Sequence, residues 1–227
     1  MFQANTPYSA TMKKPHKNKK SKKAKTKLGK LQKQITDIKN RLPVPELKAV
    51  DINSFSTSVS DSASANHPMI QIPQGNSASQ RNGDAVVLRS SSLNICVEKG
   101  DTNNVLRIIL AATPSTSNLV LSDVLEYGNV TSHGNLPFAS PYKFQPTTAE
   151  KTYTILFDKV YNLTEDVNKI MEKVKIQYGK KGKRLNFNSA SSVAPENYNV
   201  SLMYISDSSA ATHPTISYCF RTRFQDA

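Results

Sequence analysis

Lysine is concentrated in the first part of this 227-residue chain, and this limits what the segment can form. Residues 1–41 hold thirteen of the thirty Lys and Arg residues and only one of the seventeen Asp and Glu residues. The segment therefore carries +12 of the formal net charge of +13, and the remaining residues are almost neutral. A run of lysines over residues 13–27 has too few apolar side chains to form a core. The sequence predicts a polycationic arm, residues 1–45, on a near-neutral folded body.

A short amphipathic segment follows the lysine run. Its apolar side chains are three or four residues apart, which predicts a helix over residues 28–42 with one apolar stripe: Leu28, Leu31, Ile35, Ile38 and Leu42. Pro43 and Pro45 end this helix. A helix of about four turns is only marginally stable alone in water. We therefore expect the stripe to associate, either with identical copies in a small bundle or with the chain's own body.

The body has the pattern of an all-β protein. Residues 46–68 are rich in Ser, Ala and Asn and are predicted to be a linker, so the folded domain is expected at residues 69–227. There, apolar and polar side chains alternate, as over residues 93–97, 198–204 and 216–224. The apolar run at residues 105–112 fits a strand covered on both faces. About eight such segments predict an eight-stranded jelly roll of two antiparallel sheets.

Three local features of the body carry further expectations. Alternate residues from Tyr153 to Leu163 are expected on one strand face. Thr164, two acidic residues and a helical apolar spacing up to Val174 predict a short helix within a long loop. The basic residues of 180–184 are expected at a solvated hairpin tip, with nucleic-acid contact as the alternative.

Catalytic patterns are absent from the sequence. None of the four histidines has a Cys, His or acidic residue at metal-ligand spacing, and no nucleophile elbow, P-loop or dinucleotide motif is present. We therefore expect neither enzyme activity nor a cofactor. No apolar stretch is long enough to span a bilayer or to form a secretory signal. Cys96 and Cys219 are expected to be reduced and unreactive, although neighbouring strands would bring them close together.

The lysines of the arm predict phosphate binding without recognition of bases, because a lysine-rich run with few aromatics acts as a row of point charges. The candidate nucleic-acid-binding residues are Lys13, Lys14, Lys17, Lys19, Lys20, Lys22, Lys23, Lys25, Lys27 and Lys30. The same run fits a nuclear-localisation signal, so a nuclear import factor is a second expected partner.

The order of these features resembles the capsid proteins of the satellite tobacco necrosis virus type, and those of circular single-stranded DNA viruses that encode a replication-initiator protein. Residues 70–75 (IQIPQG) and 80–84 (QRNGD) resemble the family's approach to its first jelly-roll strand. Residues 153–159 (YTILFDK) resemble its central strand, which precedes a helix-bearing loop. Residues 218–226 resemble its last strand, which ends near an acidic residue. The likeness covers residues 69–227 and, by composition, the arm.

The resemblance implies a viral coat protein. It implies a T=1 icosahedral shell of about 60 copies around a single-stranded genome, with DNA favoured over RNA because the arm is so rich in lysine. At +12 each, such arms supply roughly 720 positive charges. The five stripe residues would meet where three arms converge beneath a threefold axis. The expected locations are the virion and, during assembly, the host cytoplasm and nucleus, with a host receptor as a further partner.

Two matters stay open from the sequence. Members of the resembled family bind calcium between subunits, but no ligand set can be assigned from Asp84, Asp123 or Asp158. The alternative function is a cellular nucleic-acid-binding protein with a basic tail on a β-sandwich. Such proteins usually carry basic or aromatic residues on the folded body, and the near-neutral charge of this body argues against it.

Overall fold

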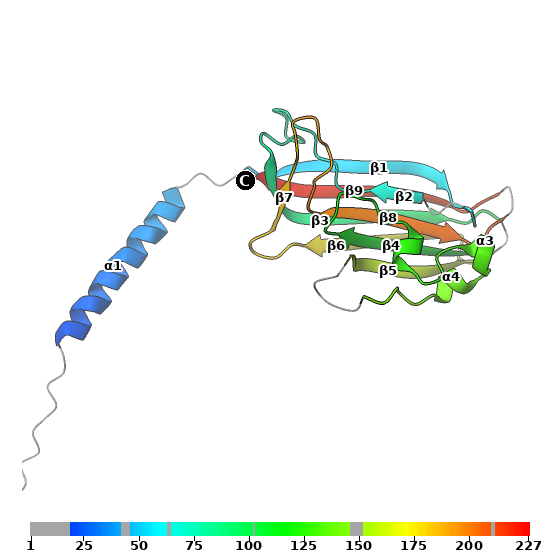
Figure 1. The fold of residues 1–227 in the computed structure, drawn as a ribbon, viewed down its shortest axis with the longest axis horizontal. Helices are drawn as coiled ribbons and strands as arrows, with labels where there is room; N and C mark the ends of the chain where they lie inside the picture. The colour runs from blue at the N-terminus through cyan, green and yellow to red at the C-terminus, as the bar shows by residue number, and fades with distance from the viewer. Residues whose placement is uncertain (1–18, 42–45, 63–64, 102, 146–151, 210–211) are drawn as a thin grey trace, which may run out of the picture. The chain divides into compact units, whose positions relative to one another are not determined.

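The computed structural model describes residues 19–41, 46–62, 65–101, 103–145, 152–209 and 212–227 (Figure 1). The chain divides into two units, residues 1–44 and residues 45–227. The first unit contains helix α1 (Lys19–Arg41). The second is a sandwich of two β-sheets, and its buried apolar residues lie between residues 59 and 224.

The sandwich has the strand order of a jelly roll. The first sheet has the order β1 (Lys48–Ser58), β9 (Thr215–Asp226), β3 (Ala85–Glu98) and β6 (Lys169–Gln177), and β7 (Lys183–Asn186) also pairs with β3. The second sheet has the order β2 (Ala65–Pro68), β8 (Asn199–Ser206), β4 (Asn104–Thr113) and β5 (Thr154–Leu163). All of these pairs are antiparallel. Apart from β7, eight strands form two four-stranded sheets, and the chain changes sheet at each step except from β4 to β5. This order confirms the predicted fold class.

The main core fills the space between the two sheets. Alternate residues of β3, β8 and β9 point into it, among them Leu93, Leu202 and Phe220, all fully buried. The alternation predicted for these three strands is therefore confirmed.

Strand β4 is buried on both faces, as its continuous apolar run predicted. Leu106, Ile108 and Leu110 point into the main core. Ile109 and Ala111 point to the other side, where they form a second core. That core is closed by residues 119–144, which contain the short helices α2 (Leu121–Val124), α3 (Val130–His133) and α4 (Leu136–Ala139). The outer face of the second sheet is thus covered by the chain's own β4–β5 connection.

Arg107 fastens this connection to the sheet. Its guanidinium donates to both carboxylate oxygens of Asp158, at 3.0 and 2.6 Å, and to the carbonyl oxygens of Pro137 and Ser140. Tyr142 donates to the same carboxylate at 2.6 Å, and partial burial together with this bond raises the pKa of Tyr142 to about 12. Because the charge of Arg107 is buried and paired at the same time, removal of either partner would leave an uncompensated charge.

The linker predicted at residues 46–68 is wrong for most of its length. Strand β1 occupies Lys48–Ser58 and pairs with β9 over nearly its whole length. Strand β2 occupies Ala65–Pro68 and pairs with β8. The apolar residues Val50 and Ile52 of β1 alternate with polar ones, but β1 is an edge strand, and its Ser and Asn residues dilute the contrast between its two faces.

The helix predicted after Thr164 is also wrong, and these residues form a turn followed by β6. The hydroxyl of Thr164 accepts a hydrogen bond from the backbone N–H of Val167, which is a turn rather than a helix cap. Ile170, Val174 and Ile176 then point toward the core at even spacing. The apolar residues of this segment fit the period of a helix almost as well as that of a strand. The segment forms a strand because it pairs with β3.

The single apolar face predicted for residues 153–163 changes side at a β-bulge. Leu110 lies opposite Phe157 and Ala111 lies opposite Ile155, so Leu156 is an extra residue. Ile155 consequently packs in the second core, while Phe157 packs against the main core.

Two further expectations require correction. The residues that resemble the approach to a first strand, 80–84, precede β3, which is the third strand of the chain. The basic segment at residues 180–184 is exposed, as expected, but it is not a hairpin tip, because β6 and β7 both pair with β3 rather than with each other. Gly182, at φ 74°, makes this connection possible because a Cβ there would lie 2.4 Å from the carbonyl oxygen of Leu88.

Lys48, the first residue of β1, is buried, and three polar partners hold its ammonium group. Its ammonium group is 2.9 Å from Asp226 and donates to the carbonyl oxygen of Gln80 and the side chain of Asn82, each at 3.0 Å. Only 3% of Lys48 is exposed. The start of β1 is therefore tied both to the end of β9 and to the loop before β3.

Arg81, which is fully buried, organises the loops at one end of the sandwich. Its guanidinium donates to the carbonyl oxygens of Ser189 and Ser192, at 2.7 and 2.9 Å, and to that of Gly83. It also stacks 4.2 Å from the ring centroid of Phe187. One planar cation thus satisfies three backbone acceptors and joins residues 81–84 to residues 187–192.

Replacement of Arg81 by Met is expected to destabilise the body by about 3 kcal/mol, because three backbone carbonyl groups lose the buried guanidinium that donates to them. Equilibrium unfolding in urea measures the change. Arg184→Met, at an exposed position, is the matched control and should change stability little. Equal effects of the two substitutions would contradict the role given to Arg81.

His67 of β2 lies between the two sheets, against Tyr204 of β8 and Tyr218 of β9. Its Nε2 is 2.7 Å from the hydroxyl of Tyr204, and its ring stacks on that tyrosine at a centroid distance of 5.5 Å. The ring of Tyr218 is 5.7 Å away. Burial without a carboxylate partner lowers the pKa of His67 below its usual value of 6.5.

Because the folded state favours neutral His67, the stability that depends on it is complete above about pH 6.5 and declines as the pH falls below that value. Urea unfolding at about pH 7.5 and about pH 5.5 should show this decline in the wild type and a smaller one in His67→Gln. His133→Gln, at an exposed histidine, should keep the full decline. Identical pH dependence in His67→Gln and the wild type would contradict the assignment.

Candidate nucleic-acid interface

Helix α1 contains most of the lysines predicted to bind nucleic acid. Seven of the ten lie within Lys19–Arg41: Lys19, Lys20, Lys22, Lys23, Lys25, Lys27 and Lys30. The other three, Lys13, Lys14 and Lys17, lie outside the described residues. Of the seven, Lys27 and Lys30 have described side chains, and both are exposed. The helix therefore presents part of the predicted cationic segment in a regular backbone.

The helix begins nine residues before its predicted start at residue 28. Lysine has high intrinsic helix propensity, and so does Ala24, which lies among the lysines of this extension. Like charges three or four residues apart repel one another along a helix. Helix propensity and charge repulsion therefore oppose each other in the first half of α1.

The apolar stripe lies on the second half of α1. Leu28, Leu31, Ile35 and Ile38 are between 52% and 61% exposed, and the predicted fifth member, Leu42, lies outside the described residues. A row of large exposed apolar side chains is typical of an association surface. The helix thus combines a lysine-rich first half with an amphipathic second half.

On the body, ion pairs neutralise much of the exposed charge. Asp51 accepts two hydrogen bonds from Arg221, at 2.7 and 2.6 Å, and these bonds lower the pKa of Asp51. Lys169 lies 2.6 Å from Glu98 and lowers the pKa of that carboxyl group. Lys159 forms a similar pair with Glu172. Each of these pairs neutralises a basic and an acidic side chain locally.

Sequence reasoning missed the basic residues at alternate positions of β6. Lys169, Lys173 and Lys175 all point away from the core. Their period of two in the sequence was the available signal, but it was hidden by the prediction of a helix over the first part of this segment.

The carboxylates considered for calcium already have other partners. Asp158 is bound by Arg107, Asp84 lies 3.3 Å from Arg81, and Asp123 accepts from the backbone N–H of Val120. Among the residues that the structure describes, no three His, Cys, Asp or Glu side chains are grouped so that they could hold a metal ion. These residues do not fit a calcium site within one copy of the chain, and we derive no role for the ion.

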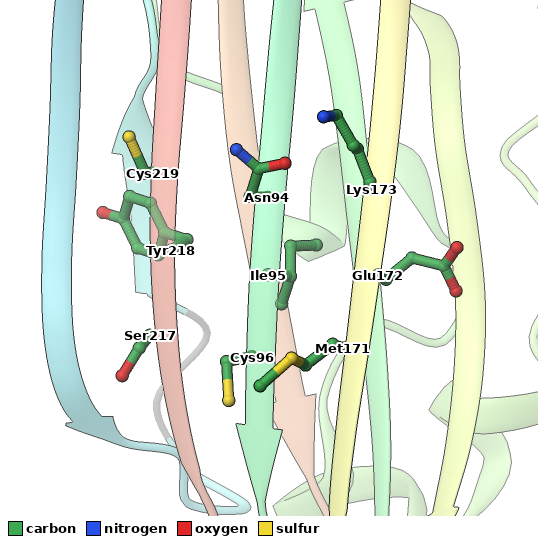
Figure 2. A pocket seen from close by; sticks show the side chains of 9 residues that line it. All are labelled: Asn94, Ile95, Cys96, Met171, Glu172, Lys173, Ser217, Tyr218 and Cys219. Atoms are coloured by element: carbon green, nitrogen blue, oxygen red, sulfur yellow. The ribbon is translucent and has the colours of Figure 1, made fainter.

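The two cysteines lie on the outer face of the first sheet, in neighbouring rows (Figure 2). Cys96 of β3 is opposite Ser217, and Cys219 of β9 is opposite Asn94, so the thiols are two residues out of register. Both are free. They line a shallow, mainly apolar hollow of about 360 Å³, together with Met171. The two cysteines therefore lie on neighbouring strands, as the sequence predicted, and these are the third and the last strands of the chain.

No helix among the described residues is long and apolar enough to cross a membrane.

Comparison with known proteins finds similarity in structure but not in sequence. No protein-family model matches the chain, and no curated protein sequence matches it. A chain of Desmodium yellow mottle tymovirus is 8% identical over 100% of this chain and 93% of its own, with a TM-score of 0.38. A chain of turnip yellow mosaic virus is 9% identical over 81% and 95%, with a TM-score of 0.35. A chain of deformed wing virus is 10% identical over 78% and 75%, with a TM-score of 0.29. The jelly roll is identified from its own strand order rather than from these similarities.

Proposed function

We propose that this chain is a viral capsid protein that assembles into a closed shell and packages single-stranded nucleic acid through its lysine-rich arm. The observation that carries the proposal is the separation of +12 of charge in residues 1–41 from a near-neutral jelly roll. Eight-stranded jelly rolls are a common architecture of viral shell domains. A near-neutral body allows copies to pack closely without mutual repulsion, while the arm supplies the countercharge for phosphates.

Exposed aromatic side chains on the body support self-association. Phe55, in the edge strand β1, is 89% exposed, and Phe144, after the β4–β5 helices, is 86% exposed. Phe55 lies at a register shift in β1, beside Ser56, whose φ of 49° is strained for a residue with a side chain. Large aromatic groups held in solvent by the backbone are typical of anchors in protein interfaces.

The finer parts of the proposal follow from the arm and the resemblance. We propose a T=1 shell, trimeric association of the stripe residues of α1 beneath a threefold axis, and single-stranded DNA in preference to RNA. The virion, with passage through the host cytoplasm and nucleus, is the proposed location. The alternative, a cellular binding protein with a basic tail, requires no closed shell, so assembly state separates the two functions.

Deletion of residues 1–44 should abolish nucleic-acid packaging while the body remains folded, because the cores lie within residues 45–227. Gel filtration of the full chain, read at 260 and 280 nm, should give a very large species rich in nucleic acid. The truncated chain should give protein without nucleic acid. A full-length chain that stays monomeric and binds oligonucleotides reversibly would contradict the capsid function and support the alternative.

Replacement of Leu31 and Ile35 by Ser should weaken particles, because each copy of α1 loses two apolar side chains of its association surface. Light scattering during titration with guanidinium should show dissociation at a lower concentration than in the wild type. Gln32→Ser with Gln34→Ser, on the same helix but outside the stripe, is the matched control. Equal midpoints for the stripe variant and the control would contradict association through the stripe.

A further inference from the structure

The outer face of the first sheet contains a trough with small side chains along its centre. On this face, β3 contributes Ser90, Ser92, Asn94 and Cys96, and longer side chains flank it on β9 and β6. The register gives three successive rows, in the order β9, β3 and β6: Arg223, Ser90 and Gln177; Arg221, Ser92 and Lys175; Cys219, Asn94 and Lys173. Figure 2 shows the last of these rows, with Cys219 and Lys173 on either side of Asn94.

Basic residues line both sides of this trough. Arg221 and Arg223 lie on the β9 side, and Lys173 and Lys175 lie on the β6 side, all four of them exposed. Arg221 is paired with Asp51, but within the described part of the chain the other three have no ion-pair partner at salt-bridge distance. Two strand spacings separate the sides by about 9.5 Å, and successive rows are about 6.8 Å apart.

A polar hollow of about 270 Å³ lies along the rows that contain Ser90 and Ser92. It is lined by Ser90, Ser91, Ser92, Lys173, Lys175, Gln177 and Arg223, and no carboxylate contributes to it. Serine hydroxyls and ammonium groups are donors that suit phosphate oxygens. The apolar hollow beside Cys96 and Met171 begins at the row of Asn94 and continues along the same strands.

We propose that this trough binds the phosphate backbone of single-stranded nucleic acid, as a second contact on the body in addition to the arm. The proposal rests on the proposed function, because it gives the packaged strand a fixed path on each copy. Lys173, Lys175 and Arg223 contact phosphates, and Ser90 and Ser92 donate hydrogen bonds to them. The adjacent apolar hollow offers a surface for unstacked bases. Sequence is not read, since the contacts are made to the backbone.

Nucleic acid fits this face better than a second copy of the chain does. Two identical faces brought together would oppose Lys173, Lys175 and Arg223 of each copy, and like charges repel. The outer face of the second sheet, in contrast, is covered by residues 119–144, so within the described part of the body it is the first sheet that has an exposed outer face. The net charge of the body hides this arrangement, because its acidic residues lie largely elsewhere or in ion pairs.

The test compares two double variants of the full chain that remove the same charge. Lys173→Gln with Lys175→Gln alters the trough, and Lys99→Gln with Lys143→Gln alters lysines that do not line the polar hollow. Binding of a short oligothymidylate is measured over a range of salt concentrations, at protein concentrations below assembly. Each lost phosphate contact lowers the slope of log affinity against log salt by about 0.7 for a single strand. The trough variant should therefore lose about 1.4 from the magnitude of the slope, and the control should keep the wild-type slope.

A wild-type slope in the trough variant, or an equal loss in both variants, overturns the proposal. A change in particle formation without a change in slope also overturns it, since the face would then be a contact between copies. Photo-crosslinking of purified particles gives a second readout on the unaltered chain, with crosslinked peptides expected from β6 and β9. The slope is measured on unassembled protein, so a chain that forms no particles but shows the expected slopes disproves the capsid function alone.

Discussion

Strand β4 has apolar side chains on both faces, and each face requires its own cover. The first sheet covers one face across the main core, and the β4–β5 connection covers the other. Arg107 holds that connection in place through buried bonds to Asp158 and to two backbone carbonyl groups. Met203 and Ile205 of β8 extend the same second core, so the outer face of the second sheet is apolar along two strands. The strands β3, β6 and β9 of the first sheet instead alternate, and their outer positions carry exposed polar and charged side chains.

Much of the fold could be predicted from the sequence, and the errors have physical causes. Alternation identified β3 and β9, since one face of each strand is buried and the contrast between their faces is strong. It also identified β8 through Val200, Leu202 and Tyr204, although that strand is buried on both faces. It failed for β1, where exposure at a sheet edge permits Ser and Asn on both faces. It failed for β6, because Ile170 and Val174 satisfy the helical and the strand periods together. A local pattern cannot decide such cases, which depend on pairing with strands distant in sequence.

The two proposed nucleic-acid contacts differ in how far the sequence reveals them. The lysines of the arm are adjacent in the chain, so composition alone indicates their chemistry. The trough combines residues from β3, β6 and β9, and these three strands are far apart in the sequence. Its lysines are ordinary surface residues until the register places them across from Arg223. Total charge was also a poor guide for the body, because ion pairs cancel part of the charge while leaving other cations grouped.

The cluster around Lys48 has a mechanical consequence. Any tension in the arm enters the body at the first residue of β1, an edge strand that would otherwise peel from β9 one hydrogen bond at a time. The buried ammonium group, fixed to Asp226, Gln80 and Asn82, lies at the point where peeling would start. Force on the arm must therefore break the contacts of this buried ammonium group before it reaches the ladder. The first pairs of the β1–β9 ladder are thereby protected from forces that act on the arm.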